Sequence, residues 1–310
     1  MKIKGLDNAV LLLDKPAGIT SFDFISKIRR IARIKKIGHS GTLDKFASGL
    51  LVICTGQATK LTRYFLESNK RYTGKIRLGI VTDTCDITGE VVSRNDLQNI
   101  NEFTIREAMA RFIGDSVQVP PEYSSLKIRG ERASDRVRRG ETVTLEGRNI
   151  TITRADIIAI DCDNGTVDFD IACSKGTYIR SIARDLGEVL GTGACLQELR
   201  RTESGKFLVE NAASAEDVEA YAGCKIPAFF ALDPAAALCS FGRIILDEAG
   251  AAKVLNGACF KRDEVVDHEI KTLETYLVFD SHEELIAIAD MDIDSWWINY
   301  HSVFNKMESY

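Results

Sequence analysis

The chain has 310 residues, of which 45% are hydrophobic and 27% are charged, and its formal net charge is −5. This composition is typical of a globular protein, and the length predicts about two domains, or one large domain with an appendage. No run of about 18 uncharged apolar residues occurs, so we expect no membrane-spanning helix and no association with a membrane.

Eight cysteines are scattered along the chain, and no two of them have the C-x-x-C spacing that is common in zinc sites. Free thiols in the reducing cytosol explain this pattern most simply. We therefore expect a cytoplasmic protein without a metal site.

Charge is distributed unevenly along the sequence. Residues 1–80 contain 16 basic and 5 acidic residues, whereas residues 231–310 contain 6 basic and 15 acidic residues. A basic first third on an acidic chain indicates either a surface that binds a polyanion or an ordinary solvated basic surface.

The first predicted elements are a strand over residues 9–13 and a turn that contains Pro16 and Gly18. Apolar residues then recur at helical spacing, which predicts an amphipathic helix over 22–33 with Ser21 as its N-cap. Lys15, in the turn, is interpreted either as a solvated lysine or as a group that orients a substrate.

The stretch from Gly38 to Leu51 contains three glycines, one histidine and a single carboxylate, Asp44. An apolar strand over 50–54 ends it. Glycines let the backbone approach a ligand closely, and functional groups concentrate on such loops. Asp44 is therefore either a functional carboxylate or an ordinary turn residue.

A helix over 57–66 and a strand over 72–80 are predicted next. Tyr72, at the entry of that strand, is either an amphipathic core residue or a platform on which a nucleic acid base stacks. Residues 82–89 are interpreted as a turn. Thr104 and Glu107 predict a capping box for a helix that continues to about residue 112.

Arginines alternate with acidic residues between positions 129 and 148. Such a pattern is typical of an ion-paired helical face, or of a mobile basic arm that closes on phosphates. Two strands are predicted within 150–173, joined by a type I′ turn at Asn164-Gly165.

A helix is predicted from about Thr177 to Leu190, with Tyr178 and Arg180 in its first turn. An arginine there opposes the helix dipole, so we expect Arg180 to have a carboxylate or phosphate partner. Prolines near positions 227 and 234 indicate a domain junction. Short strand patterns beyond it predict a small, acidic, β-rich domain.

Six motifs together resemble one family, and they stand in that family's order. They are Leu13-Asp14-Lys15-Pro16-x-Gly18-x-Thr20-Ser21, Gly38-His39-x-Gly41-Thr42-Leu43-Asp44, Lys70-Arg71-Tyr72, Thr82-Asp83-Thr84-x-Asp86-x-x-Gly89, Pro120-Pro121-x-Tyr123-Ser124 and Gly176-Thr177-Tyr178-Ile179-Arg180. On these motifs the chain resembles the TruB-type tRNA pseudouridine synthases over nearly its whole length.

The resemblance implies a mixed α+β fold whose central, mainly antiparallel sheet is flanked by helices. It implies a catalytic domain over residues 1–230, with a basic arm at about 126–148, and a PUA-like RNA-binding domain over 231–310. The implied reaction is the isomerisation of the T-loop uridine at position 55 of tRNA to pseudouridine. It implies no metal and no cofactor, and we expect a monomer that needs no protein partner.

The resemblance also assigns roles to residues. It implies that Asp44 is the carboxylate that acts as nucleophile or assists proton abstraction, that Arg180 pairs with it, and that Tyr72 stacks on the flipped base as a possible acid or base. The remaining implied substrate-binding positions are His39, which enters the loop that the base vacates, Tyr178, Leu199 and Lys15.

Three residues depart from the family pattern. Ser40 replaces a threonine and keeps the hydroxyl, Lys45 replaces a proline, and Ser134 replaces an aromatic residue of the basic arm. We expect Lys45 to affect loop rigidity more than the reaction. The negative charge of the C-terminal domain is unfavourable for a module that binds phosphates.

Three other functions compete with that of a catalytic tRNA-modifying protein. A non-catalytic tRNA-binding or tRNA-folding protein on the same scaffold is the main one, and the joint presence of Asp44, Tyr72 and Arg180 argues against it. A serine hydrolase needs glycine where Thr42 stands. The guide-RNA-dependent, dyskerin-like enzymes have basic tails that this chain lacks.

Overall fold

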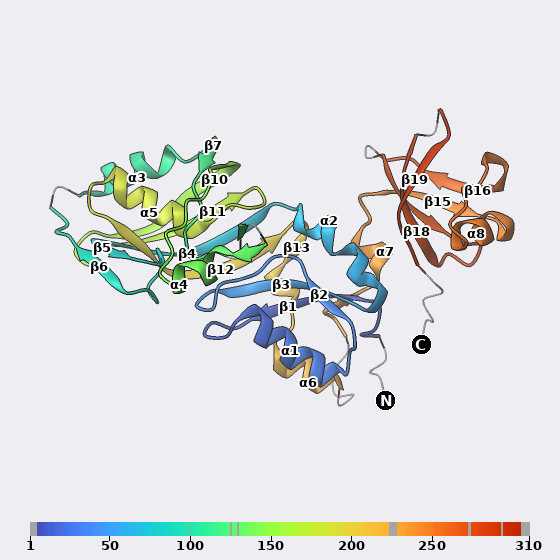
Figure 1. Cartoon of the computed structure of the whole chain (residues 1–310), viewed down its shortest axis with the longest axis horizontal. Helices are drawn as coiled ribbons and strands as arrows, with labels where there is room; N and C mark the ends of the chain where they lie inside the picture. Colours follow the sequence, from blue (N-terminus) through green and yellow to red (C-terminus); the bar gives the residue numbers. More distant parts are fainter. Residues whose placement is uncertain are drawn as a thin grey trace.

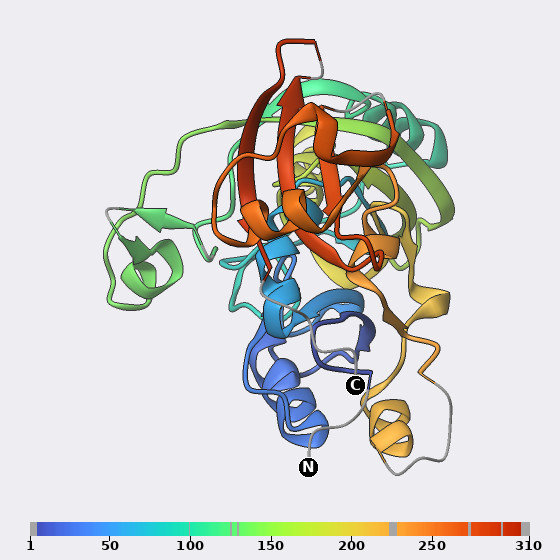
Figure 2. The ribbon, with the colours of Figure 1, turned by 90° about the vertical axis from the view of Figure 1, so that its right-hand side faces the viewer.

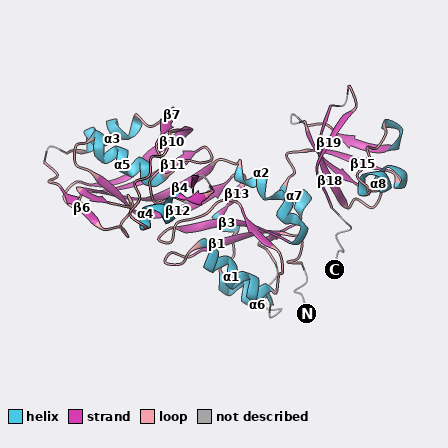
Figure 3. Cartoon of the chain, in the orientation of Figure 1, coloured by secondary structure: helices cyan, strands magenta, loops and turns pink. Residues whose placement is uncertain are grey.

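The structure is a computed structural model that describes residues 5–98, 100–124, 126–128, 130–222, 228–271, 274–292 and 294–304. Its strands form one large sheet and, near the C-terminal end, a smaller second sheet (Figure 1). Helices and strands are intermixed along the chain, which confirms the predicted mixed α+β class (Figure 3).

The large sheet has ten strands in the order β14-β1-β3-β12-β4-β11-β10-β7, with β2 on β3 and β13 on β12. The strands are β1 (Val10–Lys15), β2 (Ile37–His39), β3 (Ser48–Thr55), β4 (Lys70–Leu78), β7 (Gly114–Gln118), β10 (Arg148–Asp161), β11 (Thr166–Cys173), β12 (Ala194–Ser204), β13 (Phe207–Leu208) and β14 (Ala231–Leu232). Every described pair is antiparallel except β3 with β12. The prediction of a mainly antiparallel sheet is confirmed.

Helices cover this sheet at both of its ends. The described helices are α1 (Ser21–Ala32), α2 (Thr62–Leu66), α3 (Glu102–Ala110), α4 (Ala133–Arg138), α5 (Ile179–Val189), α6 (Ala215–Ala222), α7 (Pro234–Ala237) and α8 (Glu248–Leu255), with short 3-10 turns η1 (Gly56–Leu61), η2 (Val209–Asn211) and η3 (Arg262–Glu264). Of these, α8 packs against the second sheet. In Figure 1, α1 and α6 lie side by side against β1 and β3, and α3 and α5 lie against the β10 end.

Strand β3 is buried on both faces, which explains its uninterrupted apolar run. Leu51 and Ile53 pack with α1 and α6, whereas Leu50 and Val52 point into a second cluster on the opposite face. The strand is therefore rigidly held at the point where the glycine-rich stretch enters it.

Two small hairpins extend from the large sheet. One consists of β5 (Ile80–Thr82) and β6 (Val91–Arg94), and the other of β8 (Lys127–Ile128) and β9 (Glu131–Arg132). The second hairpin and α4 project from the body of the molecule as an arm (green, at the left of Figure 2).

The second sheet has the order β16-β15-β17-β18-β19 and confirms the predicted β-rich C-terminal region. Its strands are β15 (Gly242–Leu246), β16 (Val265–Glu269), β17 (Thr275–Phe279), β18 (Leu285–Asp292) and β19 (Trp297–Val303). Since β14 still pairs with β1, the large sheet extends slightly beyond residue 230. The division of the chain into 1–230 and 231–310 stays a prediction.

The two sheets are in contact through α2. The Tyr64 hydroxyl lies 2.8 Å from Nδ1 of His301 on β19, and the Tyr64 ring meets Phe241 edge to face. Apolar residues of both sheets share one buried cluster. In the described part of the chain, no helix is long and apolar enough to cross a membrane.

The predicted N-cap of the first helix is wrong by one residue. The cap of α1 is Thr20, whose hydroxyl accepts a hydrogen bond from the Asp23 N–H at 3.1 Å. Ser21 is buried, and its Oγ accepts from the Leu43 N–H and donates to the Leu43 carbonyl, both at 2.9 Å. The serine therefore fastens the residue that precedes Asp44.

The predicted capping box at Thr104 and Glu107 is also wrong. The cap of α3 is Asn101, whose side chain accepts from the Thr104 N–H at 3.0 Å while the Thr104 hydroxyl accepts from the Asn101 N–H. Asparagine satisfies the first free N–H groups of a helix as well as serine or threonine does, so the helix starts earlier.

The hairpin of β10 and β11 is confirmed, but its turn is not type I′. Residues 162–165 form a longer loop in which Gly165 has a φ of +62° and Asn164 has no positive φ, whereas type I′ needs both. The Asp161 carboxylate accepts from the Asn164 N–H at 2.9 Å and stabilises this loop instead.

Replacing Ser21 with alanine should loosen the Asp44 region. Both main-chain groups of Leu43 would lose their partner in a buried place, which costs about 1–3 kcal/mol. Urea denaturation measures this loss. The control is Ser116→Ala, at an exposed serine, for which a change within about 0.5 kcal/mol is expected. Equal stability of the two variants would contradict the assigned role of Ser21.

Candidate active site

Asp44 lies on the loop that joins β2 to β3, here called the Asp44 loop (residues 40–47). Several main-chain contacts shape it: the Ser40 N–H donates to the Val52 carbonyl at 2.9 Å, and the Gly18 N–H donates to the Lys45 carbonyl at 2.8 Å. Gly41 and Gly49, at either end, have φ of +101° and +106°, which favour glycine. The loop is therefore fixed at both ends.

The Asp44 carboxylate faces the Arg180 guanidinium. Oδ2 lies 2.9 Å from Nε, and Oδ1 lies 3.3 Å from Nη2. Arg180 is on the first turn of α5, and its side chain is 5% exposed, whereas that of Asp44 is 39% exposed. The predicted carboxylate partner of Arg180 is confirmed.

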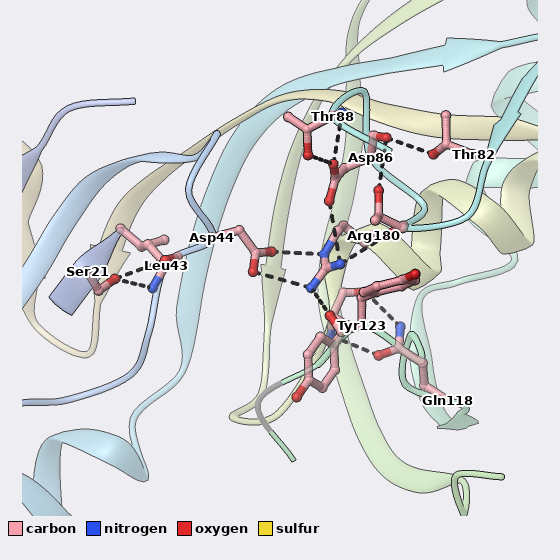
Figure 4. A network of polar contacts seen from close by, with 11 residues as sticks. Ser21, Leu43, Asp44, Thr82, Asp86, Thr88, Gln118, Tyr123 and Arg180 are labelled. Carbon is pink, nitrogen blue, oxygen red and sulfur yellow. Dashed lines mark hydrogen bonds and ion pairs between the residues drawn. The ribbon is translucent and has the colours of Figure 1, made fainter. Parts of the chain in front are cut away.

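Three further groups hold Arg180 in place (Figure 4). Its guanidinium donates to the carbonyls of Thr84 and Tyr123, both at 3.0 Å, and Nη1 lies 3.5 Å from the Asp86 carboxylate. Asp86 is itself buried and accepts a hydrogen bond from the Thr88 N–H at 3.0 Å. The guanidinium therefore has little freedom to turn away from Asp44.

Asp44 and Arg180 line a cavity of about 360 Å³. Tyr72 of β4, Leu199 of β12 and Tyr178 line the same cavity. Sequence positions far apart thus meet around one space, and five of the seven predicted site residues share it.

The prediction that Tyr178 lies in the first turn of α5 is wrong. Tyr178 is the N-cap residue of this helix and has an extended conformation. Its N–H donates to Oε1 of Gln118 at 2.8 Å, and its carbonyl accepts from Nε2 of the same side chain at 3.1 Å. Gln118 therefore fixes the backbone of a cavity residue, a role that the sequence did not indicate.

Charge and burial act in opposite directions on Asp44. The protein around the cavity removes much of the water from the carboxylate, and this burial raises its pKa above the ordinary value, whereas Arg180 lowers it. Burial also raises the pKa of the Tyr72 phenol and that of the Tyr178 phenol. Both tyrosines are therefore neutral at neutral pH.

Lys15 and His39 do not line the cavity. Lys15 is fully buried, so its interpretation as a solvated turn lysine is wrong, and its Nζ donates to the carbonyls of Pro16 and Ile19 at 2.8 and 2.9 Å. Burial lowers its pKa to about 8. His39 is half-buried on β2, where burial lowers its pKa.

Three of the arm arginines are ion-paired. Arg139 pairs with Glu131 and Glu141, Arg136 with Glu141, and Arg138 with Asp135. The interpretation of an ion-paired face is confirmed for these arginines, while closure of the arm on phosphates stays a prediction. Arg129, which belonged to the same pattern, lies outside the described residues.

Two charged residues near the cavity were missed by sequence reasoning. Asp86 belongs to the Thr82–Gly89 motif, whose sequence indicates only a turn, and Arg201 follows Leu199 closely without any motif signal. Both are buried, which no local pattern reveals. In the described ranges, no group of three or more His, Cys, Asp or Glu residues is arranged to hold a metal ion.

Comparisons with known proteins agree on one family. The TruB family pseudouridylate synthase N-terminal domain matches residues 29–179, and the tRNA pseudouridylate synthase B C-terminal domain matches residues 180–225. A tRNA pseudouridine synthase B from Clostridium tetani is 39% identical over 84% of this chain and 88% of its own length. A tRNA pseudouridine synthase B from Burkholderia pseudomallei is 40% identical over 93% of this chain and 94% of its own length.

Solved structures show the same fold at lower identity. One chain of an archaeal box H/ACA sRNP Nop10-Cbf5 complex superposes with a TM-score of 0.73 at 23% identity, covering 98% of this chain and 88% of its own. A chain of a Cbf5-Nop10-Gar1 complex superposes with a TM-score of 0.73 at 24% identity, covering 97% of this chain and 85% of its own.

Replacing Arg180 with glutamine should raise the pKa of Asp44 further, since the guanidinium is the largest influence that lowers it. Carboxyl ¹³C NMR titration measures this pKa, with the Asp44 signal assigned by its absence in Asp44→Asn. The control Arg184→Gln removes an arginine of the same helix that pairs with Asp185, and it should leave the pKa unchanged. A pKa that falls in Arg180→Gln would contradict the electrostatic coupling.

Proposed function

The chain belongs to the TruB family of pseudouridylate synthases and is an isomerase, a tRNA pseudouridine synthase, and we propose that its substrate is the T-loop uridine at position 55 of tRNA. The observation that carries this proposal is the Asp44–Arg180 pair on the wall of a cavity that two tyrosines also line. We propose that the protein works in the cytoplasm, as a monomer and without a protein partner.

The reaction leaves the elemental composition of the nucleotide unchanged. The bond between ribose C1′ and uracil N1 breaks, the uracil turns, and a bond between C1′ and C5 forms while a proton leaves C5 and another binds N1. Because nothing is oxidised, reduced or added, the reaction requires a nucleophile and proton transfers but no external reactant.

Asp44 is proposed as the nucleophile, at a sugar or uracil carbon, or as the group that assists proton abstraction. Either role needs the ionised carboxylate, and the two-point contact with Arg180 favours that form against the burial that disfavours it. Arg180 also directs the carboxylate, since Asp86 and two carbonyl oxygens hold the guanidinium from behind.

The uracil base reaches the cavity only when it flips out of the folded tRNA. Flipping a base costs a few kcal/mol, which contacts in the cavity offset. Tyr72 is proposed to stack on the flipped uracil and to transfer a proton, and Tyr178 and Leu199 to bound its pocket. His39 is proposed to enter the space that the base vacates, which agrees with its place outside the cavity.

The protein surface offers RNA a positive region. The exposed Arg29 and Arg30 of α1 belong to the basic first 80 residues. The arm and the PUA-like C-terminal sheet are proposed as further tRNA contacts, for the arm through rearrangement of its ion pairs. Lys15 acts on the substrate indirectly by fastening the turn from Pro16 to Ile19.

A non-catalytic tRNA-binding protein is the second candidate. A carboxylate on the cavity wall repels phosphates, so it contributes nothing to plain RNA binding.

A tritium-release assay tests the first candidate. Transcripts of the tRNA labelled at uracil C5 should release one tritium per molecule, and a transcript with cytidine at position 55 should release none. No release from the labelled tRNA would refute the proposed function.

Asp44→Asn should abolish turnover and retain tRNA binding. The amide keeps the size of the side chain but cannot act as a nucleophile, and removal of a negative charge does not weaken contacts with phosphates. Tritium release and filter binding measure the two properties. Asp96→Asn, at an exposed position, is the matched control and should retain both. Loss of binding together with turnover would make Asp44 a structural residue.

Binding to tRNA should weaken by more than about tenfold between 50 and 200 mM salt, because bound phosphates release counterions. Arg29→Gln combined with Arg30→Gln should flatten the plot of log Kd against log salt, since these exposed arginines form no ion pair with a described residue. Fluorescence anisotropy with labelled tRNA measures the slope. A response as flat as that of a neutral ligand would exclude an RNA substrate.

A further inference from the structure

Arg201 is a buried cation that the reaction as described above does not use. It lies on β12 with 2% of its surface exposed, and it forms no ion pair with any carboxylate in the described part of the chain. A buried charge without a counter-charge is unfavourable, so its polar contacts have to compensate for the lost water. Those contacts are main-chain oxygens.

The Arg201 side chain joins the two ends of the Asp44 loop. Its Nη2 donates to the Gly41 carbonyl at 3.2 Å, at the start of the loop, and its Nε donates to the Leu50 carbonyl at 2.7 Å, just beyond the end. One guanidinium thus spans the segment that carries Asp44.

The main chain of Arg201 supports the same loop. Arg201 is paired with Gly49 in the parallel contact of β12 with β3. A Cβ on Gly49 would lie 2.3 Å from the Arg201 carbonyl oxygen, so the two backbones are in direct contact. No residue other than glycine fits there without displacing the strand.

Arg201 also reaches the cavity and Tyr72. It stands opposite Tyr72 in the antiparallel register of β12 and β4, and the charge of its guanidinium lowers the pKa of the phenol, against the burial that raises it. Arg201, Tyr72 and Asp44 all line the cavity. A single residue therefore joins the ends of the Asp44 loop and stands beside Tyr72 at the cavity.

We propose that Arg201 is a positioning residue of the isomerisation, which holds the Asp44 loop and the Tyr72 phenol in a fixed relation around the bound uracil. The proposal rests on the proposed function. It explains why a cation is buried there: a planar group with several donors binds carbonyls at both ends of the loop, while its charge acts on the neighbouring phenol. Its charge also opposes the effect of burial on the Tyr72 pKa.

Arg201→Gln and Arg201→Lys test the proposal in the tritium-release assay. Misplacement of reacting groups lowers the rate more than binding, so kcat should fall about a hundredfold, with KM for tRNA changed less than about threefold. Lysine keeps the positive charge but lacks the planar set of donors of the guanidinium, so kcat should fall in Arg201→Lys as well. If Arg201→Gln fails to fold, as judged by circular dichroism, Arg201→Lys provides the comparison.

A second measurement separates positioning from plain stability. The absorbance of tyrosinate at 295 nm, taken as the difference from matched Tyr72→Phe variants, gives the Tyr72 titration. It should move to higher pH in Arg201→Gln, which lacks the cation beside the phenol, and stay near the wild-type position in Arg201→Lys. An unchanged titration in a folded Arg201→Gln, or a wild-type kcat in either variant, overturns the proposal.

The matched control is Arg200→Gln, on the same strand. Arg200 is 41% exposed and pairs with Asp14. This variant should keep kcat and the Tyr72 titration. Wild-type protein that releases no tritium would refute the proposed function itself, whereas active wild type with unaffected Arg201 variants refutes only the role of Arg201.

Discussion

The two-point contact between the Asp44 carboxylate and the Arg180 guanidinium is the interaction on which the rest of the site depends. Burial works against an ionised carboxylate, and a guanidinium with two nitrogens at 2.9 and 3.3 Å is the strongest available compensation. A lysine offers a point charge in place of this planar fork, so it does not fix the direction of the carboxylate. The fold supplies the partner from a helix 136 residues later in the chain.

The seam between β3 and β12 brings these parts together. It is the parallel contact within the otherwise antiparallel large sheet, and it joins the half that carries the Asp44 loop to the half that carries Tyr72 and Arg180. Gly49 permits the close approach because its backbone has a positive φ and no side chain. The relative position of Asp44 and the aromatic residues of the cavity is therefore set by main-chain packing as much as by side chains.

Local sequence patterns predicted the elements better than their ends. Apolar periodicity located α1 and β3 because burial on one or two faces leaves a direct mark on the sequence. The predicted cap at Ser21 and the predicted turn type at Asn164 are wrong, because neighbouring polar residues compete for the same main-chain groups. In the case of Ser21, the deciding partner, Leu43, lies 22 residues away.

The candidate site was predictable only in part, and for a related reason. The motifs indicated Asp44, Tyr72 and Arg180, which do line one cavity, and the dipole argument anticipated a partner for Arg180. Nothing local indicated that Asp86 stands behind Arg180, because that contact joins the β5–β6 turn to α5. Burial of a charged group is a property of the folded chain and not of a pattern of neighbours.

The apolar cluster that contains Leu50 and Val52 has a consequence for the architecture. Leu277 and Phe279 of the second sheet, and Phe304 just after it, belong to the same cluster. The C-terminal region therefore shares one apolar core with the large sheet, and Leu61 and Phe65 belong to the same core. Removal of the C-terminal region would expose apolar side chains of this common core to water, so the large sheet depends on a region outside it for part of its stability.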